Sequence, residues 1–216
     1  MSFKKERGIC MKKILFMGDS ITDAVRQRDN DCFAGNGYPT LVAARLGYDY
    51  PGEYGFLNRG ISGNRVTDLL SRIKSDMINL KPDVMSILIG VNDVWHEIGL
   101  CNGVHTELFE TVYDLLIKEL KAALPELRIM IMEPFVRPGS ATEEHWDYFQ
   151  DEVALRAAAA ARVAEKNGLE FIPLQARMEE AEQLAPTSHW LIDGVHPTAA
   201  GHEIIARAWI ETFMKK

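Results

Sequence analysis

The chain has 216 residues, of which 47% are hydrophobic and 25% are charged, and its net charge is −7. This composition is ordinary for a globular protein, and the length suits one large domain. The acidic balance argues against a surface that binds nucleic acid or anionic membrane, because such surfaces carry an excess of basic residues. We therefore expect neither nucleic acid nor a membrane among the partners of the chain.

The amino-terminal segment predicts no export signal, because the apolar run of residues 14–17 is too short for the core of a signal peptide. No stretch reaches the roughly 20 apolar residues of a membrane span. The three cysteines, Cys10, Cys32 and Cys101, fit neither a disulfide framework nor a zinc ribbon, which favours reduced thiols. We predict a cytoplasmic protein with a loosely held extension, residues 1–10, and one domain, residues 11–216.

Short apolar runs predict five strands, at residues 13–17, 55–58, 84–89, 128–132 and 170–173. Helical patterns separate these runs, and such alternation indicates a mostly parallel sheet covered on both faces. The continuous apolar run of the third strand is typical of a fully buried strand. We expect an α/β fold, a three-layer α/β/α sandwich of flavodoxin type with a five-stranded parallel sheet and the first strand at its centre.

Apolar positions at a period of 3.6 residues, with glycine or proline at the ends, predict the helices. They fall at residues 38–46, 66–80, 105–124, 143–167, 177–184 and 198–214. Gly47 is expected to end the first helix, and Gly168 is expected to cap the fourth. Leu108 and Leu115 are among the residues expected on the inner face of the third helix.

Polar or glycine-rich loops follow three of the strands, and a fourth precedes the last helix. They read Gly18-Asp19-Ser20, Asn58-Arg59-Gly60-Ile61-Ser62-Gly63-Asn64, Gly90-Val91-Asn92-Asp93 and Asp193-Gly194-Val195-His196. Ligands of open α/β sheets bind at the carboxyl ends of the strands. The four loops should therefore converge on one rim of the sheet.

Acyl transfer needs a nucleophile, a base oriented by a carboxylate, and donors aimed at the developing oxyanion. Ser20 can supply the nucleophile, and the carboxylate of Asp193 can reach His196 across a three-residue turn. The Ser20 N–H, a glycine N–H of the second loop and the Asn92 amide can supply the donors. Each part also has a structural interpretation. Ser20, Asn92 and the Asp193–His196 pair could cap helices, and the glycines could be turn residues.

Together the four blocks resemble the signature blocks of the GDSL or SGNH hydrolases, over residues 13–210. The resemblance implies the SGNH hydrolase fold, Ser20 as nucleophile, and His196 as base with Asp193 behind it. It implies no cofactor and no metal. It also implies an oxyanion hole formed by the N–H groups of Ser20 and Gly63 and by the amide of Asn92. Gly63 is preferred over the other glycine of the loop because the family's glycine follows an Ile-Ser pair.

A narrower resemblance, to bacterial carbohydrate acetyl esterases including acetylxylan esterases, rests on further segments. These are Gly37-Tyr38-Pro39, Asn92-Asp93-Val94-Trp95, Glu133-Pro134-Phe135 and Val195-His196-Pro197-Thr198-Ala199-Ala200-Gly201-His202. The likeness implies a serine esterase that removes short, chiefly acetyl, groups from saccharides, and it implies an intracellular and often homo-oligomeric protein. Two alternatives remain open: a lysophospholipase or thioesterase of the same fold, and a carbohydrate-binding protein without catalysis.

Side chains beside the loops are candidates for substrate contacts. The candidates are Asp19, Arg59, Trp95 and Trp190. The tryptophans could stack on a sugar ring or belong to the core, and the arginine could bind a polar leaving group or pair with a carboxylate. The aspartate is expected to hold the turn before the serine. His202 is interpreted as a helix-face or buffering residue.

Overall fold

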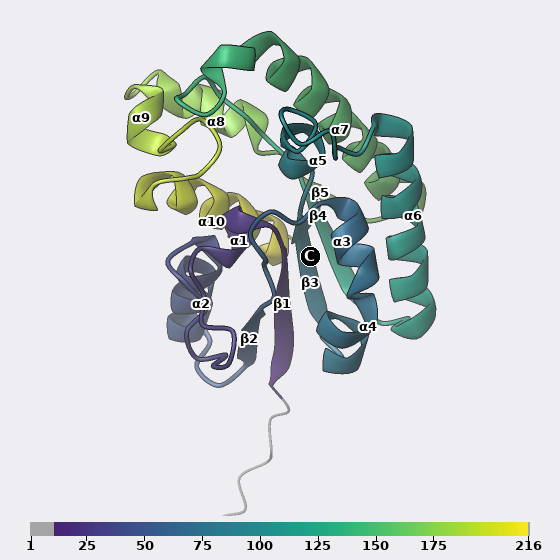
Figure 1. The fold of residues 1–216 in the computed structure, drawn as a ribbon. Coiled ribbons are helices and arrows are strands. Elements are labelled where there is room, and N and C mark those ends of the chain that lie inside the picture. The colour runs from purple at the N-terminus through teal and green to yellow at the C-terminus, as the bar shows by residue number, and fades with distance from the viewer. Residues whose placement is uncertain (1–10, 216) are drawn as a thin grey trace, which may run out of the picture.

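The computed structural model describes residues 11–215, so the predicted extension of residues 1–10, with Cys10, lies outside the described residues. Within that range, parallel strands form a sheet in the order β2-β1-β3-β4-β5 (Figure 1). Their bounds are Lys12–Gly18 (β1), Tyr54–Asn58 (β2), Val84–Leu88 (β3), Arg128–Met132 (β4) and Glu170–Ile172 (β5). The predicted five-stranded parallel sheet of flavodoxin type is confirmed.

The prediction that the first strand is central is wrong. β1 pairs with β2 on one side and with β3 on the other, and β3 occupies the middle of the sheet. The chain adds only β2 beyond β1 before it crosses over and adds three strands on the opposite side. Local sequence does not distinguish these two positions, because strands buried on both faces read alike as continuous apolar runs.

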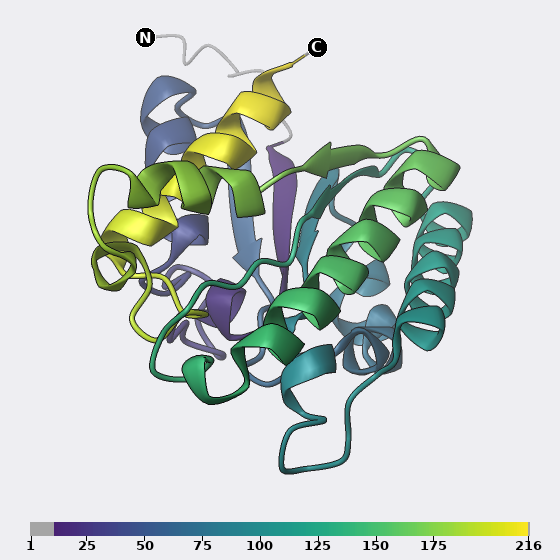
Figure 2. The ribbon, with the colours of Figure 1, turned by 90° about the horizontal axis from the view of Figure 1, so that it is seen from above.

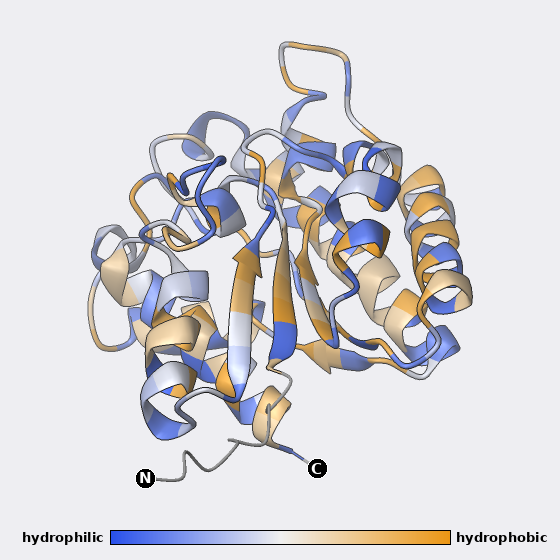
Figure 3. Cartoon of the chain, turned by 90° about the horizontal axis from the view of Figure 1, so that it is seen from below, coloured by the Kyte–Doolittle hydropathy of each residue, from blue (hydrophilic) through white to orange (hydrophobic). Residues whose placement is uncertain are grey.

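Helices cover both faces of this sheet (Figure 2). One layer contains α2 (Tyr38–Asp49) and α10 (Ala199–Met214), and the other contains α3 (Val66–Ser71), α6 (Thr106–Ala123) and α7 (Trp146–Asn167). Side chains of β1 alternate between the layers, so that Ile14 and Phe16 belong to one core while Leu15 and Met17 belong to the other. Because both faces are buried, the strands are mostly hydrophobic, as Figure 3 shows.

Shorter helical segments connect these elements. They are α1 (Ser20–Asp23), α4 (Ile73–Asp76), η1 (Ile78–Leu80), α5 (Val91–Trp95), η2 (Glu143–His145), α8 (Gln175–Glu182) and α9 (Thr187–Trp190). The single helix expected over residues 66–80 is therefore divided into α3, α4 and η1. Arg72 stands at the first break, where its guanidinium donates to the side chain of Asn64 and to the carbonyl of Arg59.

Two details of the predicted helices are also wrong. Gly47 does not end α2, because an exposed glycine costs a helix only about 1 kcal/mol and the neighbouring Leu46 is buried in the core. Leu108 and Leu115 face solvent, with exposed fractions of 42% and 44%. The buried stripe of α6 consists instead of Phe109, Tyr113, Leu116, Ile117 and Leu120. Gly168 caps α7 in the left-handed conformation, as predicted.

The loop after β2 lies directly against α1, the short helix after β1. The side-chain amide of Asn58 donates to the carbonyl of Thr22 at 2.6 Å, and its oxygen accepts the N–H of Gly60 at 2.8 Å. A Cβ at Gly60 would lie 2.3 Å from the backbone nitrogen of Asp23. The close approach of two backbones therefore requires glycine at this position.

We expect Gly60→Ala to lower the free energy of unfolding by about 1–3 kcal/mol, because the new methyl group meets backbone atoms that cannot rotate away. The matched control is Gly55→Ala in β2, where a Cβ meets nothing within 4 Å and the change should stay within about 0.5 kcal/mol. Urea unfolding measures both variants. Equal stabilities would show that the loop can move away from α1.

Candidate active site

Ser20 is the first residue of α1 and follows the carboxyl end of β1. The short helix is capped by Asp19, whose carboxylate accepts the N–H of Ile21 at 3.0 Å. The interpretation of Ser20 as the cap is therefore wrong, and its hydroxyl is available for another partner. That partner is the imidazole of His196, whose Nε2 lies 2.9 Å from the serine Oγ.

The turn before α10 orients His196. The Nδ1 atom of the ring lies 2.7 Å from one carboxylate oxygen of Asp193, while the other oxygen accepts the N–H groups of Val195 and His196. The turn therefore combines the capping arrangement with the contact to the imidazole. Because the carboxylate can only accept, Nδ1 carries a proton, and Nε2 of the neutral ring accepts from Ser20.

The same contacts shift the ionisation of both partners. The hydrogen bond to Asp193 raises the pKa of His196 above its usual 6.5, and burial offsets part of the rise. Burial disfavours the charged form of Asp193, but hydrogen bonds from the His196 ring and two backbone N–H groups outweigh it and lower its pKa to about 2. Asp193 is therefore an anion at neutral pH.

The loops after β2 and β3 meet beside this pair. Gly63 has a φ of 80°, in the left-handed region that favours glycine. The amide nitrogen of Asn92, in α5, donates to the carbonyl of Asn64 at 3.1 Å. The fully buried carboxylate of Asp93 accepts the N–H of Val66 at 3.1 and 3.2 Å. The start of α3 is therefore tied to α5, and Asn92 lies beside the loop that contains Gly63.

Other residues that hold the loops together had little or no signal in the sequence. Asp23 accepts the backbone N–H of Ser62 at 3.1 Å and so links α1 to the loop that contains Gly63. Arg72 donates to the side chain of Asn64 at 2.9 Å. Asp23 lies only three residues after Ser20, and this closeness to the first block could have suggested a role in holding the site. Arg72 lies within a predicted helix and carries no comparable signal.

With this geometry in view, comparison with known proteins identifies the family. Residues 16–204 match the model of the GDSL-like lipase/acylhydrolase family. The chain belongs to this family. It is a carboxylic ester hydrolase, and it is 35% identical over 209 residues to an acetylxylan esterase of Geobacillus stearothermophilus, with 92% of each chain covered.

Solved structures of similar proteins support the same assignment. The hydrolase superposes with a TM-score of 0.89 on a protein of Parabacteroides merdae that is described as a GDSL-like lipase. The two are 36% identical, and the match covers 94% of this chain and 97% of the other. It superposes with a TM-score of 0.84 on the acetylxylan esterase Axe2 of Geobacillus stearothermophilus, at 32% identity, covering 97% and 98%. The predicted SGNH hydrolase fold is confirmed.

A cavity of about 510 Å³ lies beside Ser20 and His196 in the hydrolase. Its wall combines polar and apolar side chains from α1, the loop after it, the second block and the start of α10. Members of the wall are Ser20, Val25, Asn36, Ser62, Ile192, His196 and His202. The cavity adjoins both the serine and the histidine.

The four predicted substrate contacts lie outside the wall of this cavity. Trp95 packs against the ring of His196, with centroids 5.9 Å apart. The indole N–H of Trp190 donates to a backbone carbonyl, and its ring lines a different hollow beside α8 and α10. Arg59 pairs with Asp31 at 2.5 Å. Asp19 is buried, and burial raises the pKa of its carboxyl to about 7.

Of the interpretation of His202 as a helix-face or buffering residue, the helix position holds, because the residue lies in α10, but the buffering role is wrong. Its exposed fraction is 7%, and its Nδ1 accepts the backbone N–H of Tyr38 at 3.2 Å. Burial lowers the pKa of the ring to about 4, and the charge on nearby His196 acts in the same direction. The first turn of α10 packs against the start of α2, which removes this histidine from solvent.

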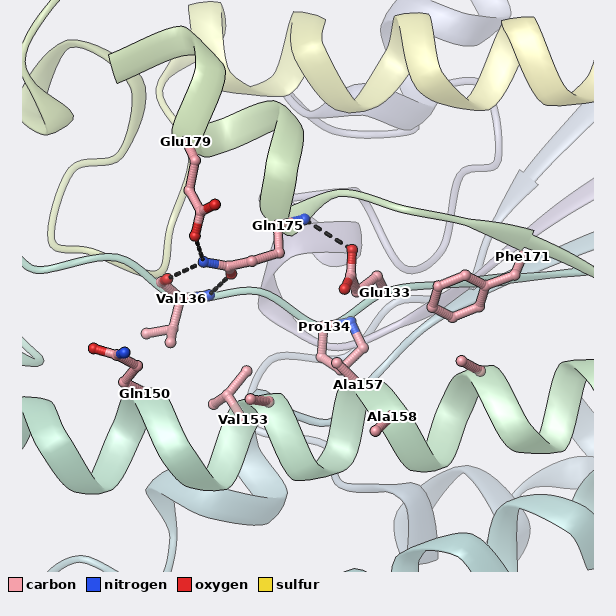
Figure 4. A pocket seen from close by; sticks show the side chains of 12 residues that line it. Glu133, Pro134, Val136, Gln150, Val153, Ala157, Ala158, Phe171, Gln175 and Glu179 are labelled. Atoms are coloured by element: carbon pink, nitrogen blue, oxygen red, sulfur yellow. Dashed lines mark hydrogen bonds between the residues drawn. The ribbon is translucent and has the colours of Figure 1, made fainter. Parts of the chain in front are cut away.

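A second cavity, of about 390 Å³, lies between α7 and α8 (Figure 4). The amide of Gln175 donates to the carbonyl of Val136 and to Glu179, and Glu133 accepts backbone N–H groups at the start of α8. The described residues that line it include no serine, cysteine or histidine. The cavity therefore lacks the nucleophile and the imidazole base of a serine hydrolase.

Within residues 11–215 no three His, Cys, Asp or Glu side chains are grouped so that they could hold a metal ion. In that same part of the chain no helix is both long and apolar enough to cross a membrane. Cys32 and Cys101 are exposed free thiols.

We expect the pKa values of the two histidines of the cavity to be shifted in opposite directions from the usual 6.5. His196 should have a pKa above 6.5, because Asp193 stabilises its cation, and His202 should stay neutral to about pH 4. NMR titration of imidazole signals measures both values. In Asp193→Asn the pKa of His196 should fall while that of His202 changes little. A His196 pKa at or below 6.5 in the parent protein would contradict this account.

Proposed function

We propose that this hydrolase removes short, chiefly acetyl, groups from saccharides through an acyl-enzyme formed on Ser20. The observation that carries the proposal is the continuous chain of contacts from the hydroxyl of Ser20 through the imidazole of His196 to the carboxylate of Asp193. A serine placed in this way has a base within reach, and the base has a fixed tautomer.

The reaction begins when Oγ of Ser20 attacks the ester carbonyl and His196 takes its proton at Nε2. The carbonyl π electrons move onto oxygen, and the resulting oxyanion is stabilised by the N–H groups of Ser20 and Gly63 and by the amide of Asn92. As the tetrahedral intermediate collapses, the C–O bond to the alcohol breaks, and the imidazolium gives its proton to the leaving oxygen. Asp193 stabilises the imidazolium without itself taking the proton.

Water then repeats the sequence on the acyl-enzyme. His196 takes a proton from water as the water oxygen attacks the acyl carbon, and collapse of the second intermediate releases the acid and returns the proton to Oγ of Ser20. The orientation of the Asn92 amide, held by the carbonyl of Asn64, supports its role as a donor in both steps. Neither step calls for a cofactor.

The substrate class rests on the cavity and on the relatives. Polar side chains, among them Asn36, Ser62 and Thr198, share the wall with apolar ones, which suits an alcohol that carries hydroxyl groups. The similar proteins include acetylxylan esterase of Geobacillus stearothermophilus. An acetylated saccharide is accordingly the proposed substrate. A lysophospholipid or thioester substrate of the same chemistry is the second candidate.

Ser20→Ala should lower kcat for p-nitrophenyl acetate by about 10⁶-fold, because the covalent intermediate can no longer form. The matched control is Ser62→Ala, which removes a hydroxyl from the same cavity wall and should keep kcat within about tenfold. Steady-state kinetics measures both variants. Activity retained in Ser20→Ala would refute the mechanism, and absence of turnover in the parent protein would favour a binding protein without catalysis.

The acyl chain distinguishes the two substrate candidates. Along p-nitrophenyl esters from acetyl to octanoyl, we expect kcat/KM to be highest for acetyl and to fall as methylene groups are added, each worth about 1–3 kcal/mol in a pocket that selects by size. Acetylated xylo-oligosaccharides should release acetate, which is measured directly because these substrates carry no p-nitrophenyl group. A maximum at octanoyl would favour the lysophospholipase interpretation instead.

A further inference from the structure

His202 is a buried histidine that the proposed mechanism does not use, although it lines the same cavity as Ser20 and His196. It stands in the first turn of α10, and 7% of its surface is exposed. A Cβ built at Gly37 would lie 2.9 Å from Cε1 of its ring, so the start of α2 packs tightly against the imidazole. The ring is therefore held in one orientation.

The tautomer of His202 follows from its backbone partner. The N–H of Tyr38 can only donate, so Nδ1 of His202, at 3.2 Å, must be the acceptor and carries no proton. Burial lowers the pKa of the ring to about 4, which keeps it neutral at neutral pH. In a neutral imidazole the remaining proton then lies on Nε2, and that atom is a donor.

The Nε2 atom of His202 has no hydrogen-bond partner among residues 11–215. The fully buried and unpaired side-chain atoms in that range belong to Thr67, Ser86 and Trp209, and Nε2 of His202 is not one of them. This nitrogen therefore keeps some exposure, and the cavity beside Ser20 is the hollow that His202 lines. The cavity wall accordingly contains a rigid donor that no described group of the protein satisfies.

The position of the proposed reacting groups indicates which part of an ester meets this donor. The leaving oxygen must lie beside His196, which protonates it, and His196 lines the cavity. The oxyanion must face Gly63 and Asn92, which are not part of the cavity wall. The alcohol part of the ester therefore occupies the cavity that contains His202.

We propose that the Nε2–H of His202 binds an acceptor oxygen, a hydroxyl or ring oxygen, in the alcohol part of the substrate. This inference rests on the proposed function, because it places the alcohol by the role of His196. By binding this oxygen, His202 favours alcohols with several oxygens, such as saccharides, over simple alkyl alcohols. The donor is neutral, so it selects for polar acceptors without requiring a charge on the substrate.

Two substitutions separate this role from the contact with Tyr38. In His202→Asn, Oδ1 can take the place of Nδ1 and still accept the Tyr38 N–H, but the donor toward the cavity is lost. In His202→Gln, the terminal amide nitrogen can take the place of Nε2, while the acceptor for Tyr38 is lost. Thermal unfolding of both variants reports the structural contact independently of selectivity.

The experiment compares kcat/KM for acetylated xylobiose and for cyclohexyl acetate, whose ring has no oxygen besides the ester. His202→Asn should lower the ratio of the two values by about three- to tenfold, the worth of one neutral hydrogen bond, and should leave cyclohexyl acetate nearly unchanged. His202→Gln should restore the ratio to within about threefold of the parent, even if its stability is lower.

An equal fall for both substrates, or an unchanged ratio in His202→Asn, would overturn the inference. A ratio in His202→Gln as low as in His202→Asn would also overturn it, because the donor would then not be the deciding group. Failure of the proposed function has a different signature. It would appear as hydrolysis of cyclohexyl acetate that survives Ser20→Ala, whatever the selectivity of the His202 variants.

Discussion

The parallel pairing of β2, β1 and β3 is the constraint on which the candidate active site depends. These strands are neighbours in the sheet, so their carboxyl ends lie side by side although the chain reaches them far apart in sequence. The segments that follow them carry Gly63 in a loop, Ser20 at the start of α1 and Asn92 in α5, in that spatial order. Apolar layers on both faces hold the strands, and each loop therefore starts from a fixed point.

Carboxylates convert these converging loops into a rigid site. Asp19 accepts the N–H of Ile21, Asp23 accepts that of Ser62, and Asp93 accepts that of Val66. Loops and helix starts leave backbone N–H groups without ladder or helix partners, and a buried carboxyl oxygen can accept from them. The cost is visible in the pKa of Asp19 and of Asp93, which burial raises above the usual value despite these donors.

Two histidines in one cavity show how surroundings decide the chemistry of a side chain. His196 lies against an anionic carboxylate, which raises its pKa and makes Nε2 an acceptor. His202 lies against a backbone N–H without a counter-ion, and burial lowers its pKa and leaves Nε2 as a donor. The same imidazole can therefore serve as a base at one position and as a fixed neutral donor at another.

The sequence by itself determined the fold class, the five strands and the polar blocks after them, because buried strands and strand-end loops have local signatures. It also brought Ser20, Asp193, His196 and Asn92 together as candidates, since their chemistry complements one another, whereas the choice of Gly63 rested on the resemblance to the hydrolase family. Only the tertiary structure decided that β3 is central, that Asp19 caps α1, that Arg59 pairs with Asp31, and that His202 is buried against the backbone N–H of Tyr38. These outcomes depend on which surfaces pack against each other, and contacts between residues distant in the chain leave no periodic pattern in the sequence.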